Sequence, residues 1–413
     1  MLFLPCPLPC QSKEETDSQS HSNHLHSQSS NSSLHSQPSL PYIPSLTQPS
    51  QQHEQQSSTT HHSCISTLKG HYSSIFSLSI AGKHLYSGSS DSEIRIWSRD
   101  PSTLENSTNN NTVSSGHSAV KSFTFLGDKL FSAHQDHKIR VWKMENNTPN
   151  KPYKCIAVLP TLSDRVTTLF WAKNYVQVRR HKKSTWVNHV DTISALALSN
   201  DGSLLYSVSW DRTLKVWRTS DFKCLESVWN AHDDAINAIV VSSDGFVYTG
   251  SADKKIKKWR TYYGDKKHSL VSTLEKHKSA VNALAISADG SVLYSGACDR
   301  SIIVWEKDDS DGDSCGGGMV VVGALRGHSK AILCLAIVSD LVCSGSADKT
   351  VRIWRRGIGR SYSCLAVLEG HRGPVKCLTA AVNSSNNIRV NSDSETSYLV
   401  YSGSLDCDIK IEV

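Results

Sequence analysis

Histidine, serine, aspartate and tryptophan recur in this chain in one order and at one spacing. In the stretch from Gly327 to Trp354, Asp348 stands four residues after Ser344 and six before Trp354, and His328 lies upstream. A serine, a histidine and an aspartate that converge once, next to an oxyanion hole, make the nucleophilic site of a hydrolase. The first chemistry to test is therefore nucleophilic catalysis.

The repetition of this set argues against catalysis. A reaction needs one such cluster, whereas a repeated structural unit needs one network in every copy. We therefore predict hydrogen-bond networks that brace the fold, with no catalytic residue, no cofactor site and no metal site. The sets are His71, Ser87, Asp91, Trp97; His117, Ser132, Asp136, Trp142; His189, Ser207, Asp211, Trp217; His232, Thr249, Asp253, Trp259; His277, Ser295, Asp299, Trp305; His328, Ser344, Asp348, Trp354; and His371, Ser402, Asp406, with Glu412 in the tryptophan position.

Short apolar, β-branched runs surround each set and are bounded by Ser, Gly and Asp, which predicts tight antiparallel meanders. Most intervals between successive histidines lie in the forties, the period of a four-stranded propeller blade. We therefore predict an all-β, seven-bladed propeller over residues 63–413. The interval from His117 to His189 is longer. We interpret residues 161–183 as an insertion, and an eighth, degenerate blade is the alternative.

Spacing and composition together resemble those of the WD-repeat β-propeller proteins, although no tryptophan of a set is followed by Asp. The segment VQVRRHKKSTWVNHVDTISALALS resembles, more narrowly, plant JINGUBANG-like WD-repeat proteins. The family resemblance implies that each Asp bridges the His, the Ser or Thr and the indole N–H. It also implies protein partners and a regulatory role in growth or development. Because Glu412 cannot donate as an indole does, we expect the seventh blade to be the weakest.

The ends of the chain have different compositions. Residues 11–62 are rich in Ser, Gln, His, Asn and Pro, which predicts a disordered tail over 1–62. Residues 64–68 resemble the runs before the other histidines. We expect this strand to pair with the last strand and close the ring, which removes an exposed edge.

Charge and cysteine content bound the function. A formal net charge of +6 is too small to indicate nucleic acid by itself. The 12 cysteines lack the paired spacings of a zinc site, so free thiols and a reducing compartment are expected. We predict a cytoplasmic protein, also nuclear if the basic run Arg179–Lys183 is an import signal and not a solvated hairpin face. The acidic stretch 308–318 lacks a closing glutamate and predicts a flexible loop, not a calcium site.

Function is then expected on the propeller surface, where the resemblance places partners on one flat face. Trp210 and Leu405 directly precede the aspartates of their sets, Asp211 and Asp406. Such side chains are unusual for exposed turns, which suggests binding hot spots. The alternative is that Trp210 packs under a neighbouring loop. The predicted partner-binding residues are Phe76, Lys121, Gln135, Trp210, Asn237, Asn282, Leu333, Arg372, Lys376 and Leu405.

The leading prediction is a monomeric, non-catalytic scaffold that recruits regulatory proteins or peptides away from membranes. One alternative is a substrate receptor of a cullin-type ubiquitin ligase, but the Trp-Asp-x-Arg motif that such receptors usually carry does not occur here. Another is an RNA-associated factor or a propeller enzyme. No stripe of arginine and aromatic residues and no asymmetric acid/base cluster supports either of these.

Overall fold

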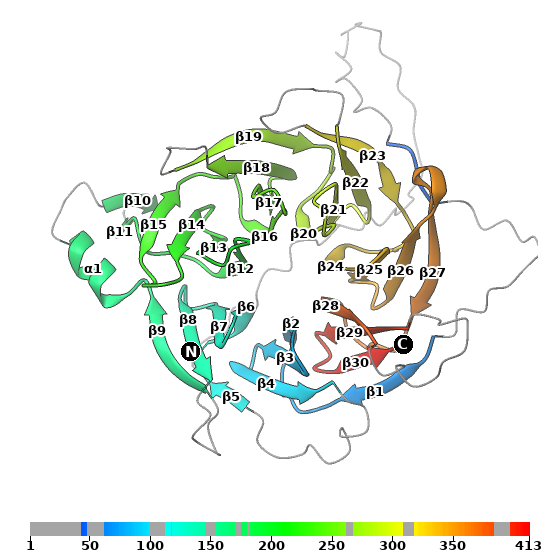
Figure 1. Cartoon of the computed structure of the whole chain (residues 1–413), viewed down its shortest axis with the longest axis horizontal. Helices are drawn as coiled ribbons and strands as arrows, with labels where there is room; N and C mark the ends of the chain where they lie inside the picture. The colour runs from blue at the N-terminus through cyan, green and yellow to red at the C-terminus, as the bar shows by residue number, and fades with distance from the viewer. Residues whose placement is uncertain are drawn as a thin grey trace, which may run out of the picture.

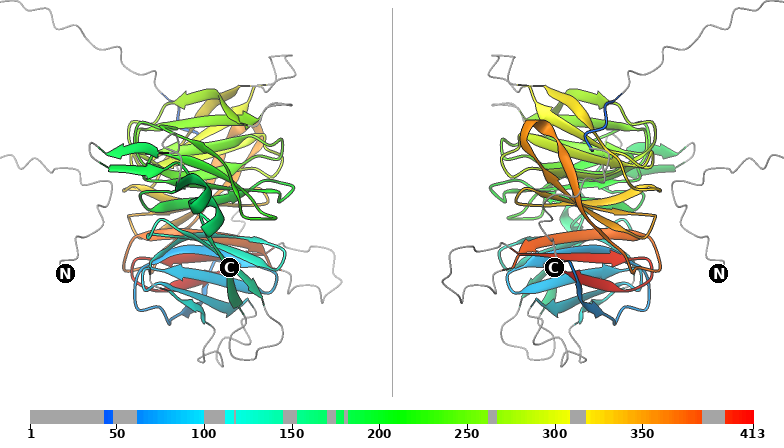
Figure 2. Two further views of the ribbon diagram at one scale, coloured as in Figure 1. Left: turned by 90° about the vertical axis from the view of Figure 1, so that its left-hand side faces the viewer. Right: turned by 90° about the vertical axis from the view of Figure 1, so that its right-hand side faces the viewer.

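The computed structural model describes residues 43–47, 62–99, 112–116, 118–144, 153–169, 175–179, 182–261, 267–308, 318–383 and 397–413. Seven four-stranded antiparallel sheets surround a common axis (Figure 1). The predicted seven-bladed β-propeller is thereby confirmed. Figure 2 shows the ring of blades edge-on from two sides.

Six blades are runs of four consecutive strands, with the first strand nearest the axis. They are blade one, β2 (Ile75–Ala81), β3 (His84–Ser89), β4 (Glu93–Ser98) and β5 (Thr112–Ser115); blade two, β6 (Val120–Leu126), β7 (Lys129–His134), β8 (Ile139–Met144) and β9 (Tyr153–Leu159); blade three, β12 (Ile193–Leu198), β13 (Leu204–Ser209), β14 (Leu214–Arg218) and β15 (Cys224–Val228); blade four, β16 (Ile236–Val241), β17 (Val247–Ser251), β18 (Lys255–Thr261) and β19 (His268–Glu275); blade five, β20 (Val281–Ile286), β21 (Val292–Ala297), β22 (Ile302–Lys307) and β23 (Met319–Leu325); and blade six, β24 (Ile332–Val338), β25 (Leu341–Ser346), β26 (Val351–Arg356) and β27 (Tyr362–Leu368), with a 3-10 turn at Ile358–Arg360 before β27.

Blade seven is built from both ends of the propeller. It consists of β28 (Val375–Val382), β29 (Tyr398–Ser404), β30 (Ile409–Glu412) and, as its outer strand, β1 (Cys64–Leu68). β1 runs antiparallel to β30, with Leu68 opposite Ile409 and Cys64 opposite Glu412. This pairing closes the ring and leaves β30 with partners on both sides.

A helix and a hairpin lie between blades two and three. Helix α1 (Leu162–Leu169) is capped where Thr161 Oγ1 accepts the Asp164 N–H and donates to the Asp164 carboxylate. β10 (Tyr175–Arg179) pairs only with β11 (Lys182–Thr185) in a separate two-stranded sheet. This insertion is not an eighth blade, because its described elements are one helix and one hairpin.

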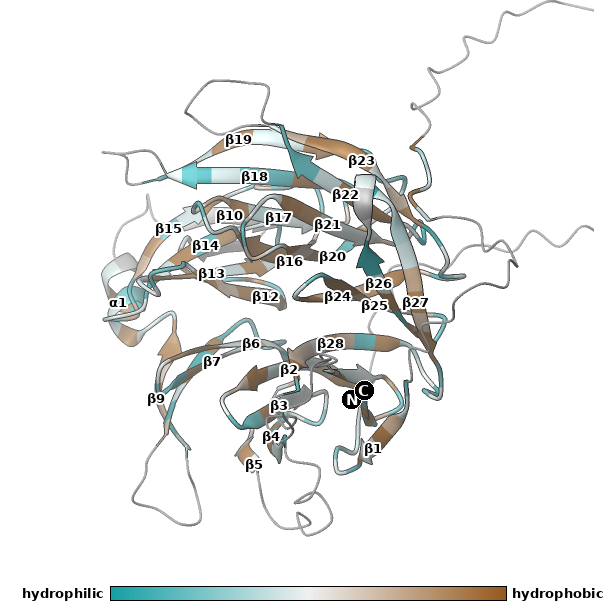
Figure 3. Ribbon diagram, turned by 45° about the vertical axis from the view of Figure 1, so that its right-hand side comes forward, coloured by the Kyte–Doolittle hydropathy of each residue, from teal (hydrophilic) through white to brown (hydrophobic). Residues whose placement is uncertain are grey.

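The apolar core is divided among the seams between neighbouring blades. The seam of blades seven and one, for example, contains Ile75, Trp97, Tyr401 and Ile409. Glycines directly after the hydroxyl residue of a set permit the close approach: a Cβ on Gly296, which follows Ser295, would lie 2.5 Å from the Ile332 side chain of the next blade. Hydrophobic residues accordingly dominate the inner strands in Figure 3.

Residues 43–47 depart from the prediction of a wholly disordered tail. They lie in extended form against β23 and β27 (the short blue segment in Figure 1). The average composition of the tail conceals a local apolar pair, Ile43 and Leu46, which pack against the seams beside β23. Within the described residues, no helix has the length and apolar character needed to cross a membrane.

Candidate functional site: the tetrads and the tetrad face

A hydrogen-bonded chain of four side chains recurs in blades one and three to six. In blade four, His232 Nδ1 lies 2.8 Å from Asp253 Oδ2, and His232 Nε2 lies 2.8 Å from Thr249 Oγ1. The Trp259 indole N–H donates to the same hydroxyl at 2.9 Å. Equivalent contacts join the predicted residues of blades one, three, five and six.

The hub of each tetrad is the hydroxyl, and not the aspartate as the resemblance implied. The Asp253 carboxylate contacts His232 and accepts from backbone N–H groups, including that of Asp233, but it reaches neither Thr249 nor Trp259. The imidazole joins the two groups: its Nδ1–H donates to the carboxylate, and its Nε2 contacts the hydroxyl. The difference arises because sequence spacing fixes which residues are neighbours but not which atoms face each other.

Burial makes these networks structural. The hydroxyl-bearing residues are fully buried, as for Thr249 at 0% exposure. Burial raises the pKa of Asp253, but the hydrogen bond and charge of His232, together with backbone N–H groups, outweigh it and lower that pKa to about 2. The serine or threonine oxygen is occupied by an indole and an imidazole, so it is not available as a nucleophile. Losing one partner would orphan a buried polar group, at a cost of about 1–3 kcal/mol.

Blade two departs from the predicted set. The Ser132 hydroxyl receives the Trp142 indole at 2.8 Å, but its imidazole partner is His134. Asp136 forms a bidentate ion pair with Arg140 instead of contacting a tetrad histidine. The predicted His117 lies outside the described residues. A sequence signal was present: the other tetrad histidines stand four residues before the inner strand, as His71 does before Ile75, whereas His117 stands three before Val120.

Blade seven keeps three members of the tetrad. His371 Nδ1 lies 3.0 Å from Asp406 Oδ2, and His371 Nε2 lies 2.9 Å from Ser402 Oγ. Glu412 pairs with Val400, where Trp354 pairs with Val342 in blade six. Its side chain is buried, and Oε2 has no hydrogen-bond partner within the described part of the chain. Burial raises the pKa of Glu412 to about 7, partly offset by the charge of Lys410.

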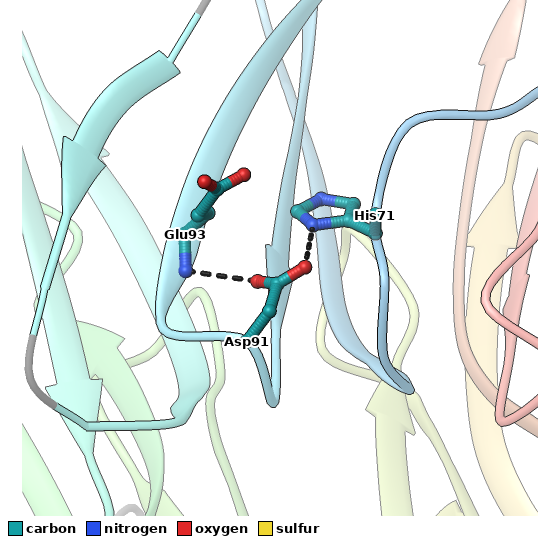
Figure 4. A group of neighbouring side chains, drawn as sticks. All are labelled: His71, Asp91 and Glu93. Atoms are coloured by element: carbon teal, nitrogen blue, oxygen red, sulfur yellow. Dashed lines mark hydrogen bonds and ion pairs between the residues drawn. The ribbon is translucent and has the colours of Figure 1, made fainter.

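His71, Asp91 and Glu93 could in principle offer ligand atoms to a metal ion (Figure 4). Their donor atoms are already engaged. His71 binds Asp91 through Nδ1 and Ser87 through Nε2, while the Glu93 carboxylate pairs with Arg95 at 2.8 Å. A metal would have to break these contacts, so we interpret His71 and Asp91 as members of the blade-one tetrad and not as metal ligands.

The tetrads define one face of the ring, which we call the tetrad face. It consists of the loops that contain the tetrad histidines and the turns that contain the tetrad aspartates. In every blade, the N–H of the residue before the aspartate donates to a loop carbonyl, as from Trp210 to Thr192 at 3.0 Å. The residue after the aspartate is an exposed cation in blades three to six: Arg212, Lys254, Arg300 and Lys349.

A β-bulge re-aims one residue near the start of every inner strand. Two of these residues meet a third predicted partner-binding residue: the Lys121 ammonium lies 3.6 Å from the centroid of the Phe76 ring and 6.0 Å from that of a Trp210 ring. Both distances fall within cation–π range. Trp210 is half-buried. We call these three residues the aromatic–lysine cluster.

Two predicted partner-binding residues are engaged within the fold. The Asn237 amide donates to the Val281 carbonyl of the next blade at 3.0 Å, and the Asn282 amide donates to that of Ile332 at 2.8 Å. Ser194 makes the same contact from blade three to Ile236. These bulge residues link neighbouring blades. Sequence reasoning missed Ser194, although it occupies the same strand position.

The other predicted partner-binding residues lie around the tetrad face without forming one cluster. Gln135 and Arg372 are exposed, whereas Leu333, Lys376 and Leu405 are half-buried. The Leu405 carbonyl accepts from Ser74 of blade one. Burial lowers the pKa of Lys376. The face therefore combines apolar, aromatic and cationic groups.

The expectations for the basic run, the acidic stretch and the cysteines can be compared only in part with the described residues. The hairpin of β10 and β11 spans the basic run, but Arg180 and His181 lie outside the described residues, as does most of the acidic stretch, 309–317. Eight described cysteines are free thiols, whereas Cys298 is disulfide-bonded. The expectation of free thiols rested on matched strand positions, and Cys298 lies in a turn instead.

The geometry defines a β-propeller built from repeats, and the comparison with protein families agrees. The model of the WD domain, G-beta repeat (WD40), matches residues 62–98, 180–218, 222–260, 268–306, 319–355 and 362–411. The chain belongs to the WD40 repeat family. The matched ranges leave out residues 99–179, which contain blade two with its altered tetrad. WD40 propellers generally act as non-enzymatic scaffolds that bind proteins.

The chain is also similar to individual proteins. It is 28% identical over 167 residues to zinc finger CCCH domain-containing protein 62 of Arabidopsis thaliana, covering 40% of this chain and 37% of that protein. It is 30% identical over 112 residues to pre-mRNA-processing factor 19 homolog 2 of the same plant, covering 27% and 19%. Its similarity therefore spans well under half the length of these relatives.

A solved structure has the same fold. The WD40 β-propeller domain of Doa1 superposes with a TM-score of 0.60 at 21% identity and covers 86% of this chain and 97% of that chain. At this level of identity the likeness concerns the architecture of the ring.

Proposed function

We propose that this protein is a non-catalytic scaffold that recruits regulatory proteins by binding an acidic peptide segment on its tetrad face. The observation that carries the proposal is the aromatic–lysine cluster, where the Lys121 ammonium lies within cation–π range of both Phe76 and Trp210. An aromatic anchor beside a partly desolvated cation is typical of a binding hot spot. The cations Arg212, Lys254, Arg300 and Lys349 supply a basic surround.

Charge on the rest of the face agrees with an acidic partner. Its acidic residues outside the tetrads include Asp233, which pairs with Lys255, and Asp191 and Asp234, which accept from backbone N–H groups. On the opposite face, blades five and six enclose a cavity of about 280 Å³, lined in part by Asp289, Asp340 and Arg356. It is smaller than most small-molecule sites, which occupy about 300–1,000 Å³. This pocket lies apart from the aromatic–lysine cluster, and we propose a peptide or protein as the occupant of the tetrad face.

The finer proposals rest on resemblance. The segment 176–199 supports membership among JINGUBANG-like plant proteins, and hence a role in growth or development. We place the protein in the cytoplasm as a monomeric ring and propose that the basic run Arg179–Lys183 directs import to the nucleus. The relative named for pre-mRNA processing supports, less directly, an RNA-associated role.

Selection of a displayed random-peptide library on the purified protein tests the function. We expect enriched peptides with a net negative charge. Lys121→Ala and Trp210→Ala should each weaken their binding by about tenfold or more. The matched control is Lys129→Ala, because Lys129 makes a similar contact with Phe222, 5.4 Å from its ring, at the other end of blade two. Equal losses in Lys121→Ala and Lys129→Ala, or enrichment of basic peptides, would contradict the proposal.

A further inference from the structure

The segment Ile43–Thr47 pairs with the outer strands of two different blades. The Ala324 N–H of β23 donates to the Pro44 carbonyl at 2.9 Å, and the Leu46 N–H donates to the Ala324 carbonyl at 2.9 Å. On the other side, the Tyr362 N–H of β27 donates to the Leu46 carbonyl at 3.2 Å. Both pairings are parallel. The segment therefore joins blades five and six as an added strand, a recognised mode of peptide binding.

Gly323 creates the space for this strand. A Cβ at Gly323 would lie 2.6 Å from Leu46 Cδ2 and 2.9 Å from the Pro44 carbonyl oxygen. Gly323 faces Val304 across β22 and β23. The corresponding outer-strand positions of blades two, three, four, six and seven carry side chains: Ala157, Glu226, Ser272, Ala366 and Ser66. Among these six outer strands, β23 alone has no side chain at the position where the added strand packs.

Other seams use their own side chains at this depth. Between blades three and four, the Glu226 carboxylate accepts from the backbone N–H of His268 and lies 2.7 Å from its Nδ1. Between blades one and two, the Tyr86 and Tyr153 hydroxyls meet at 2.7 Å. The seam of blades five and six has a similar tyrosine pair, Tyr294 and Tyr362, and still accommodates the added strand beside it. We call this place, formed by Gly323, Ala324 and Tyr362, the strand seat.

The segment has the properties of an exchangeable occupant. Pro44 and Ser45 are exposed, so the side-chain contacts come chiefly from Ile43 and Leu46. Pro44 has no N–H to leave unpaired. The triplet Pro-Ser-Leu occurs twice in the tail, at residues 38–40 and 44–46, which gives the seat two local copies of one pattern. Another chain with the same pattern could make nearly all of the contacts that hold this short strand.

We propose that the strand seat is a peptide-binding site for an extended segment of the pattern proline–any residue–leucine in a partner protein. Residues 43–47 occupy it as an intramolecular competitor. The tethered copy lowers the apparent affinity for a partner by the fraction of time the seat is free. This site is separate from the tetrad face and does not rest on the function proposed for that face.

The test uses the full chain and a fluorescent peptide with the sequence of residues 41–49, followed by anisotropy. In the double variant Leu40→Asp/Leu46→Asp, neither tail copy can fill the seat. We expect this variant to bind the peptide at least about tenfold more tightly than the natural chain. Adding Gly323→Val should abolish the gain, whereas Ser272→Val, at the matching position of blade four, should preserve it. Thermal unfolding of each variant establishes that it is folded.

Three outcomes would overturn the proposal. The first is equal peptide affinity in the natural and double-variant chains. The second is an equal loss of binding in Gly323→Val and Ser272→Val. The third is a dimer in sedimentation that dissociates on Leu46→Asp, because a second copy would then fill the seat. Lys121→Ala should leave this peptide's affinity unchanged, so failure here is distinguishable from failure of the tetrad-face proposal.

Discussion

The Nε2 of His134 lies 2.8 Å from the Oγ of Ser132, so blade two takes its imidazole from its own second strand. In the six other blades, the imidazole comes from the preceding loop, as His328 does for Ser344. His134 Nδ1 contacts the Ser118 carbonyl at 3.1 Å, which ties strand and loop together by another route. Blade two therefore keeps the buried hub while changing the residue that reaches it.

This substitution of one histidine for another predicts which of the two matters for stability. His134→Ala should lower the free energy of unfolding by about 1–3 kcal/mol, because it removes the buried imidazole that bonds the Ser132 hydroxyl and the Ser118 carbonyl. His117→Ala should change it by less than about 0.5 kcal/mol. Chemical denaturation of both variants decides the matter. Equal losses, or a larger loss for His117→Ala, would show that the loop histidine forms the tetrad after all.

Burial of His134 and the charge of Arg140 lower the pKa of His134 to about 4, although the charge of Asp136 opposes this. In the unfolded chain His134 is therefore protonated below about pH 6.5, whereas in the folded chain it is protonated only below about pH 4. Stability should fall as pH falls through this window, by up to about 1.4 kcal/mol per pH unit. Denaturation midpoints between pH 4 and 7 should show a shallower slope in His134→Gln than in the natural protein.

Glu412 predicts the opposite pH dependence. Its raised pKa keeps it protonated when folded up to about pH 7, whereas the unfolded side chain ionises near 4.5. Stability from this group is present below pH 4.5 and is lost as pH rises through 7. Glu412→Gln should therefore stabilise the protein by up to about 3 kcal/mol at pH 8 and by little at pH 4.5. A gain that is independent of pH would contradict this explanation.

We expect Lys376 to lower the stability of the fold and to contribute to the binding of acidic peptides. Burial lowers its pKa, and among the described residues it forms no ion pair. Lys376→Met keeps the apolar stem and removes the buried charge, so we expect a gain of about 1 kcal/mol in stability and weaker binding of acidic peptides. Lys330→Met, at an exposed loop position, is the control. A variant that is less stable yet binds acidic peptides fully would show that Lys376 is structural.

Much of the fold was predictable because the tetrads combine identity with fixed spacing. Asp253 and Trp259 could be placed from that spacing alone, whereas the order of the hydrogen bonds could not, since it depends on side-chain direction. The contact of Asn237 with Val281 could not be predicted, because an amide near an inner-strand bulge can face a neighbouring blade or solvent equally well in a sequence pattern. Leu46 was missed because composition averaged over a long tail hides one apolar anchor.

The central claim is that the tetrads brace the ring and the tetrad face binds partners. Its most direct test is the affinity of a selected acidic peptide for Trp210→Ala and Asp253→Asn, measured at a temperature where both variants are folded. We predict that Trp210→Ala loses binding and that Asp253→Asn, which alters a buried brace, keeps it. Loss of binding in Asp253→Asn with full binding in Trp210→Ala would contradict the account.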